Sequence, residues 1–197
     1  MSRPDWLAGA GAVLALWNDV DEEVAADYED WHANEHVPER LTVPGMLGAR
    51  RFEADGRRSR PRFLTLYALH DAQVLQSAPY LRLLSHPTPA SARMRPHLRN
   101  LSRWVCRVQQ ASLRWIEAPV AVHTGAHAPA PGGEANALLV AQRLPDAPGL
   151  PWLAAGQAAA VQGTWLVLRS AGDGDGDAGP AADMDVCRPL PIAQTRC

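Results

Sequence analysis

The chain has 197 residues, enough for one ordinary domain or two very small ones, and 47% of them are hydrophobic, as in a globular protein. The 19 basic and 21 acidic residues leave a net charge of −2, which argues against a nucleic-acid partner and against attraction to an anionic membrane. A small-molecule ligand, uncharged or weakly polar, is therefore expected. Every basic residue is arginine, so mechanisms that need a lysine Schiff base are excluded.

The cysteine content and the hydrophobic runs predict a cytoplasmic protein. Cys106, Cys187 and Cys197 are too few and too scattered for a disulfide framework. The first residues fit a signal peptide poorly, and no stretch approaches the roughly 18 apolar residues of a membrane span.

The first predicted elements are a strand and a helix. Residues 11–20 form an apolar run bounded by glycine, which favours a buried strand. Acidic residues follow and favour a helix from about residue 21 to residue 36. Pro38 has no N–H to donate and collides with the preceding turn, so residues 38–41 are predicted as a kink or a separate turn.

Two further strands and a second helix follow. After a turn at Pro44 and Gly45 the chain is predicted to run as a strand to about residue 54. Residues 61–71 alternate in the manner of a third strand, and residues 71–85 favour a helix that is interrupted or restarted at Pro79. A fourth strand is predicted near residues 101–113. Residues 1–113 therefore indicate an α+β, ferredoxin-like βαββαβ domain.

The remaining chain partly repeats this order. Residues 114–136 are interpreted as a linker or loop, because much of the segment is rich in Gly, Ala and Pro. Residues 137–197 are interpreted as a degenerate second ferredoxin-like copy, with a strand, a shorter helix near 149–161 and two more strands. The two copies are expected to form an α/β-barrel-like pair of sheets.

The helix after the first strand carries polar residues on its apolar face. At about 100° per residue, an arc of roughly 100° contains Tyr28, Trp31, His32, Glu35 and Glu39, with His36 at its edge. Burying an uncompensated charge costs several kcal/mol, so these residues are expected to line a cavity. The alternative is that His32 and Glu35 pair with each other, or with arginines, as satisfied structural groups.

The stretch "HANEH" also matches H-x-x-E-H, a zinc-protease motif in which two histidines one turn apart bind the metal. That motif needs an uninterrupted helix and a third ligand. Pro38 follows two residues after His36, and no later carboxylate lies on an evident helix. No metal is therefore expected at this position.

Several segments together resemble one family. A first strand ending in W-x-D is followed by "DWHANEHVPERL", "VPGMLGARRF", "FLTLYAL" and "SAPYLRLLSHPTP". In this order they resemble the EthD-like proteins of the dimeric α/β-barrel superfamily, over roughly residues 11–108. The resemblance implies a ferredoxin-like unit whose sheet packs against a second such sheet, from another chain or from an internal repeat. It also implies a cavity between sheet and helices.

What the resemblance implies about activity is broad. The superfamily includes cofactor-independent monooxygenases, isomerases, decarboxylases and dehydratases of aromatic or polyketide-like compounds, and some haem proteins. The helix histidine of the EthD-like pattern falls on His32 or His36. Assembly is expected as a monomer with an internal pseudo-dimer or as a homodimer.

The leading hypothesis is a small-molecule enzyme of the lyase, isomerase or cofactor-independent oxygenase type, which acts on a hydrophobic aromatic or carbonyl compound without a cofactor. His32 or His36 is the expected general acid/base, because histidine titrates near neutral pH. Glu35 or Glu39 is expected to orient or stabilise the charged imidazole. Substrate-binding roles are expected for Tyr28, Trp31 and Tyr67, which form an apolar wall, and for Arg51, which holds an oxyanion.

Two other hypotheses stay open from the sequence. One is a non-catalytic ligand-binding or structural α/β-barrel protein, and the other is a haem-binding protein that uses one of the two histidines. An open, polar-lined pocket that reaches His32 or His36 favours an enzyme, whereas a filled cavity favours the structural alternative.

Overall fold

The computed structural model describes most of the chain. The described residues are 6–54, 60–112, 118–130, 137–147, 149–150, 152, 161–171 and 184–192. No helix among them is both long and apolar enough to cross a membrane. The predicted helix near 149–161 falls almost wholly outside the described residues.

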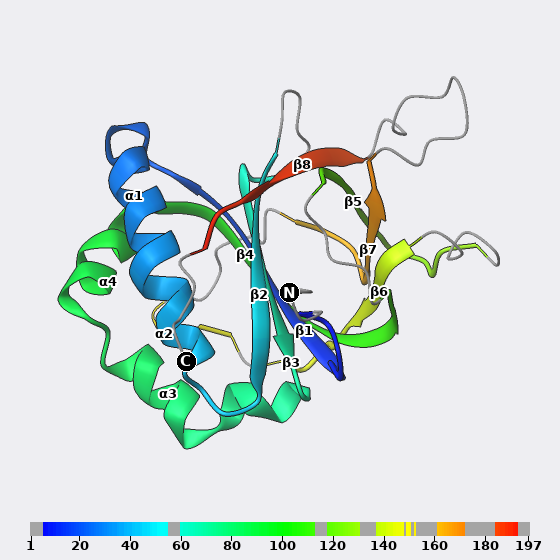
Figure 1. Ribbon diagram of the computed structural model, residues 1–197, viewed down its shortest axis with the longest axis horizontal. Coiled ribbons are helices and arrows are strands. Elements are labelled where there is room, and N and C mark those ends of the chain that lie inside the picture. Colours follow the sequence, from blue (N-terminus) through cyan, green and yellow to red (C-terminus); the bar gives the residue numbers. More distant parts are fainter. Residues whose placement is uncertain are drawn as a thin grey trace, which may run out of the picture.

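The described strands form a closed antiparallel barrel (Figure 1). In chain order they are β1 (Ala12–Val20), β2 (Met46–Ala54), β3 (Phe63–Leu69), β4 (Leu98–Ala111), β5 (Val120–Gly125), β6 (Ala137–Arg143), β7 (Trp165–Ser170) and β8 (Asp185–Leu190). Around the barrel the order is β1-β3-β2-β8-β5-β7-β6-β4, and β4 pairs again with β1. Closure leaves no unpaired sheet edge. The structure thus confirms the α+β class and a barrel-like sheet.

The strand side chains alternate between the two faces of the barrel wall, as extended chains require. In β1, Val13, Ala15 and Trp17 belong to a core cluster that contains residues of both halves of the chain, so they point into the barrel. The Trp17 and Trp104 rings meet edge to face inside, with centroids 5.2 Å apart. Leu14, on the opposite face, joins a second cluster with helix residues. The barrel interior is therefore filled by side chains.

The helices gather on one side of the barrel, against the half formed by β1 to β4 (Figure 1). The first group is α1 (Ala25–Trp31), a π-helical turn (His32–His36) and α2 (Val37–Leu41). The second group is a 3₁₀ turn (Ala72–Gln76), α3 (Ala78–Ser85), α4 (Pro89–Met94) and a 3₁₀ turn (Arg95–His97). A break at Ser77 separates the first two of these, two residues before the predicted restart at Pro79. Helix α4 was not predicted.

The separate turn predicted at residues 38–41 is present as α2 (Val37–Leu41), but helical backbone does not end near residue 36, because the π-turn joins α1 to α2. The Val37 N–H donates to the carbonyl of His32, five residues earlier, which is the hydrogen bond of a π-turn. Pro38 then occupies the first turn of α2, where its missing N–H is tolerated. The wider turn accommodates the proline that would otherwise break the helix.

The segment interpreted as a linker contains strand β5. Because β5 pairs with β7 and β8, it is an integral part of the barrel wall. The pairing also repeats itself: β1 pairs with β3 and β4 as β5 pairs with β7 and β8. Likewise, β2 pairs with β3 and β8 as β6 pairs with β7 and β4. In this pattern of pairing, β5 has the position in the second group of strands that β1 has in the first.

Candidate functional site

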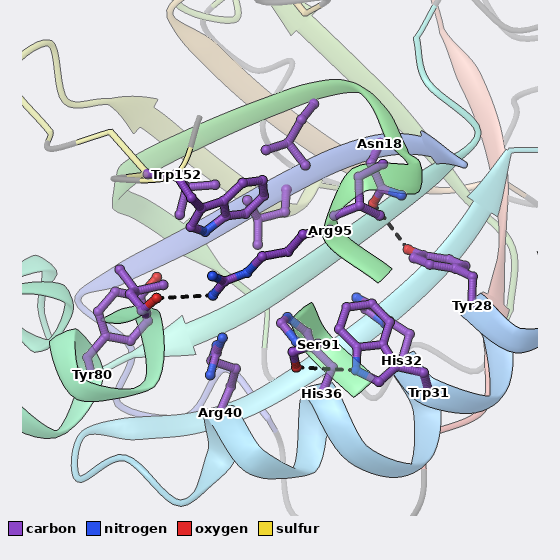
Figure 2. Close-up of a pocket in the computed structure, with 15 residues that line it drawn as sticks. Asn18, Tyr28, Trp31, His32, His36, Arg40, Tyr80, Ser91, Arg95 and Trp152 are labelled. Carbon is purple, nitrogen blue, oxygen red and sulfur yellow. Dashed lines mark hydrogen bonds between the residues drawn. The ribbon is translucent and has the colours of Figure 1, made fainter. Parts of the chain in front are cut away.

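A pocket of about 60 Å³ lies between the first helix group and the outer face of the sheet, outside the barrel interior (Figure 2). Its floor comes from β1 and β4, and its sides come from α1 to α4. The apolar lining residues are Leu16, Leu84, Leu98, Leu101, Leu150 and Trp152. This is the position between helix and sheet at which the sequence led us to expect a cavity.

Four residues at a constant spacing of four form one wall of the pocket: Tyr28, His32, His36 and Arg40. In a regular α-helix, a step of four residues overshoots one turn by about 40°, so a row of this spacing drifts around the helix. The wider π-turn at 32–36 reduces that overshoot and keeps the row on the pocket side. π-Turns often occur at functional sites for this reason: they re-aim side chains within a helix.

The two imidazoles of this wall are stacked on each other, with ring centroids 5.1 Å apart. His32 is almost fully buried, and its ring also contacts Tyr28 and Trp31. The Nδ1 atoms of both histidines are buried and have no hydrogen-bond partner within the described part of the chain. The rings are therefore not the sealed, fully hydrogen-bonded groups that a purely structural role predicts.

Burial and positive neighbours keep both imidazoles neutral. Loss of solvent lowers the pKa of His32 well below its ordinary value, and His36 and Arg51 lower it further. The pKa of His36 is also lowered well below its ordinary value, by burial and then by Arg40 and Arg95. Both rings are in the base form at neutral pH.

Hydrogen bonds fix the aromatic residues of the helix. The Tyr28 hydroxyl donates to Asn18 Oδ1 of β1 at 3.1 Å, and burial raises the pKa of this phenol. The Trp31 indole donates from Nε1 to Ser91 Oγ of α4 at 3.3 Å (Figure 2). These two bonds tie the helix to the sheet on one side and to α4 on the other.

The opposite wall carries Arg95, Trp152 and Tyr80. The Arg95 guanidinium lies 5.0 Å from the Trp152 ring centroid, in a cation–π contact, and donates from Nη2 to the Leu84 carbonyl at 3.1 Å. Figure 2 shows Arg95 extending across the pocket, between Trp152 and the helix that carries His36 and Arg40. A second, buried guanidinium, Arg40, lies on the helix side.

Of the predicted residues, Tyr28, Trp31, His32 and His36 line this pocket. Glu35 and Glu39 do not. The Glu35 carboxylate accepts a hydrogen bond from the Thr88 hydroxyl at the start of α4, and Glu39 pairs with Arg40 at 3.0 Å. The sequence placed both glutamates on the cavity face because it assumed a regular α-helix throughout.

The remaining two predicted residues also lie outside the lining. Arg51 is buried in the sheet, where it pairs with Glu29 at 3.0 Å and donates to the Pro191 carbonyl at 3.2 Å. From this position outside the pocket, the positive charge of Arg51 lowers the pKa of both histidines. Tyr67 is fully buried in the core cluster beneath the helices, where burial raises its pKa. The expected oxyanion role of Arg51 and the wall role of Tyr67 therefore have no geometric support in this pocket.

Other reactive groups lie elsewhere. Within the described residues, the group of three potential metal-ligating side chains is Asp21, Glu23 and His97, which does not include His32 or His36. In that group Asp21 already pairs with Arg99 at 2.7 Å. Burial raises the pKa of Cys106 to about 12, so this thiol is not a nucleophile at neutral pH.

Sequence reasoning missed Arg40, Arg95, Asn18, Ser91 and Trp152 as pocket residues. Arg40 could have been found, because it continues the spacing of four that links the two histidines. Ser91, Arg95 and Trp152 lie 66 to 127 residues beyond Ala25, the first residue of α1, and no local pattern marks them.

Comparison with known proteins yields a distant likeness only. The sequence matches no protein-family model and no curated protein. A solved structure from Fusobacterium nucleatum whose proposed activity is that of a monooxygenase aligns with a TM-score of 0.45 and 13% identity, over 81% of this chain and 75% of that one. An anthrone oxidase-like protein aligns with a TM-score of 0.48 and 11% identity, over 93% and 96%. Both TM-scores lie below 0.5, so neither likeness identifies an activity for this chain.

Proposed function

We propose that the protein is an enzyme that acts on a small aromatic or carbonyl compound by histidine acid/base chemistry, without a cofactor. One observation carries this proposal: two neutral imidazoles form the wall of an otherwise largely apolar pocket, and neither Nδ1 atom has a hydrogen-bond partner within the described residues. Structural histidines are normally hydrogen-bonded, whereas a base that receives a substrate proton must keep a nitrogen available.

We assign the proton-transfer role to His36. Its ring is half-buried, whereas His32 is only 5% exposed and is enclosed by Tyr28 and Trp31. His36 would accept a proton from a carbon next to a carbonyl group. The C–H electron pair would form a C=C bond as the π pair of the C=O bond moves to oxygen, which gives an enolate. Return of the proton to the same or a neighbouring carbon completes an exchange or an isomerisation. His32 would hold the His36 ring by stacking.

Hydrogen–deuterium exchange tests this chemistry without knowledge of the substrate. The protein is incubated in deuterated buffer with single-ring aryl ketones and aryl 2-oxo acids, and loss of the α-hydrogen signal is followed by NMR. Wild-type protein should accelerate exchange of at least one compound, and His36→Gln should slow it by about 100-fold or more, the usual contribution of a general base.

The exposed His86 provides the matched control for that experiment. His86→Gln should exchange at the wild-type rate, because its ring lies away from the pocket. No acceleration of exchange with any compound, or equal rates for wild type and His36→Gln, would contradict the proposed function. In that case the pocket would belong to a non-catalytic binding protein.

The haem-binding alternative fits the pocket poorly. Ligand pockets for drug-sized molecules occupy about 300 Å³ or more, and haem is larger than most such ligands. The pocket beside His32 and His36 has a volume of about 60 Å³. Its volume therefore favours a ligand much smaller than haem.

We also propose that the chain is an internal pseudo-dimer of two ferredoxin-like units and is monomeric in solution. The second unit would comprise β5 to β8, so it would begin near residue 118 instead of residue 137. The repeated pairing pattern supports this division, because β5 to β8 bond to one another as β1 to β4 do. The pairing order of β1 to β4 and the position of the helix that carries His32 and His36 support the resemblance of residues 11–108 to EthD-like proteins.

A further inference from the structure

The charged groups that line the pocket are all of one sign. Its titratable lining residues are Tyr28, His32, His36, Arg40, Tyr80 and Arg95, and no carboxylate is among the lining residues. Both imidazoles are neutral because burial lowers their pKa values. Two guanidinium groups therefore provide the net charge of the pocket wall.

Arg95 forms no ion pair with a carboxylate within the described residues, and Glu39 acts on its charge only through space. The side-chain bond of Arg95 is to the carbonyl of Leu84, and its flat face rests on Trp152. Burial, followed by the nearby Arg40, lowers the pKa of Arg95, as expected for a cation held near another cation. A half-buried, uncompensated charge is costly, which a complementary ligand would offset.

Arg40 is only partly compensated. Its Nη1 atom donates to Glu39 Oε2 at 3.0 Å, and its other side-chain nitrogens have no hydrogen bond within the described chain. Arg40, Arg95 and Glu39 together leave one unbalanced positive charge at the pocket. A single monoanion neutralises this charge, whereas a phosphate dianion exceeds it.

We propose that the pocket binds a small monocarboxylate with an apolar or aromatic body, whose carboxylate lies between Arg95 and Arg40. Guanidinium groups match carboxylates in charge and in planar geometry. The hydroxyl of Tyr80, which also lines the pocket, supplies a neutral donor beside them. Trp31, Trp152 and the leucines of the pocket provide apolar surface for the body of the ligand.

This inference deepens the proposed function and rests on it for the chemistry, but not for the binding. The carboxylate would lie next to His36, whose protonation is opposed by burial and by Arg40 and Arg95. By neutralising these arginines, the bound anion would favour a proton on His36. The substrate class would therefore be a small carboxylic acid that also carries a carbonyl or an aryl group.

Calorimetric titration of the full chain tests the charge preference directly. The probes are benzoate and phenylacetate, their uncharged amides benzamide and phenylacetamide, and phenyl phosphate. We expect each carboxylate to bind at least about tenfold more tightly than its amide, because only the carboxylate forms charge-assisted hydrogen bonds with the guanidinium groups. We also expect the carboxylates to bind more tightly than the phosphate.

Two arginines of α4 and its continuation provide matched variants. Arg95→Gln should weaken carboxylate binding at least tenfold while leaving amide binding unchanged. Arg93→Gln, at an exposed position of α4, should bind like wild type. Thermal melting verifies that each variant is folded. If Arg95→Gln does not fold, the titration of the wild-type protein with the ligand series still tests the preference for carboxylates.

Three results would overturn the inference: no binding of any carboxylate at millimolar concentration, equal binding of carboxylate and amide, or tighter binding of phenyl phosphate. Its failure is distinguishable from that of the proposed function. Carboxylates that bind without any hydrogen–deuterium exchange would contradict the enzyme proposal alone. Exchange of uncharged ketones, with no preference for anions in the titration, would contradict the carboxylate inference alone.

Discussion

At the residue scale, the buried histidines make stability depend on pH. His32 and His36 have pKa values well below the ordinary value in the folded state, so the folded protein does not take up protons there near pH 6. The unfolded chain does, once the pH falls below about 6.5. Protons bound by the unfolded chain alone favour unfolding, so the stability present above pH 6.5 is lost as the pH falls toward the folded pKa values.

Urea denaturation between about pH 7.5 and pH 5.5 measures this effect. Each histidine should lower the free energy of unfolding by up to about 1.4 kcal/mol per pH unit below its unfolded pKa. The double variant His32→Gln/His36→Gln should lose that part of the slope, and the exposed His86→Gln should keep it. A slope that the double variant leaves unchanged would show that the imidazoles are not held neutral.

At the element scale, the π-turn determines which residues reach the pocket. It keeps His36 and Arg40 in line with Tyr28 and His32, and it leaves Glu35 and Glu39 outside the lining. Pro38, directly after the turn, cannot donate the hydrogen bond of a regular α-helix at that point. The proline and the π-turn are therefore parts of one local arrangement.

Replacing Pro38 by alanine should separate stability from binding. Alanine restores a hydrogen bond worth about 0.5–1.5 kcal/mol but adds about 0.4–1 kcal/mol of entropy to the unfolded chain, so the free energy of unfolding should change by less than about 1 kcal/mol. A regular α-helix would turn His36 and Arg40 away from the pocket. Carboxylate affinity should fall several-fold, as measured by calorimetry, while the helical circular dichroism signal stays.

The matched control is Pro79→Ala. Pro79 also lies in the first turn of a helix, but α3 has no π-turn and Pro79 does not line the pocket. Affinity should therefore be unchanged in this variant. Wild-type affinity in Pro38→Ala would show that the proline does not maintain the alignment of the row.

At the scale of the whole molecule, each half of the chain completes the barrel of the other. Strand β2 pairs with β8, and β4 pairs with β6, so removing the second half would expose two sheet edges. It would also uncover interior residues such as Trp17, Phe52 and Trp104, which are now fully buried. Exposed edges and apolar surface both promote aggregation.

A chain that ends at residue 112 should therefore aggregate or dimerise, whereas the full chain should elute as a monomer in size-exclusion chromatography with light scattering. Co-expression of residues 118–197 should restore a soluble, monodisperse complex, because it supplies both missing edges. If the fragment of residues 1–112 stays monomeric and has the thermal stability of the full chain, this result would contradict the internal pseudo-dimer.

The sequence by itself determined the elements that are set by local pattern. The apolar run of β1 and the alternation of β3 predicted their strands, because burial on one or both faces produces a fixed period. Polar residues on the apolar face of the first helix predicted a pocket wall that contains Tyr28, Trp31 and the two histidines. The resemblance of several segments, taken in order, indicated the barrel-like arrangement.

Only the tertiary structure decided which residues complete the site. Arg95 and Trp152 share the pocket with His36 because β4 returns beside β1 and because Trp152, between β6 and β7 in the chain, lies at the same pocket. The pairing of the strands in the second half also emerged only from the closed barrel. The sequence of β5 is short and has no pattern that distinguishes it from a loop segment. Local sequence sets which face of an element is apolar, but contacts between segments more than fifty residues apart depend on how all the faces pack together, so the charge of the pocket was decided by the fold.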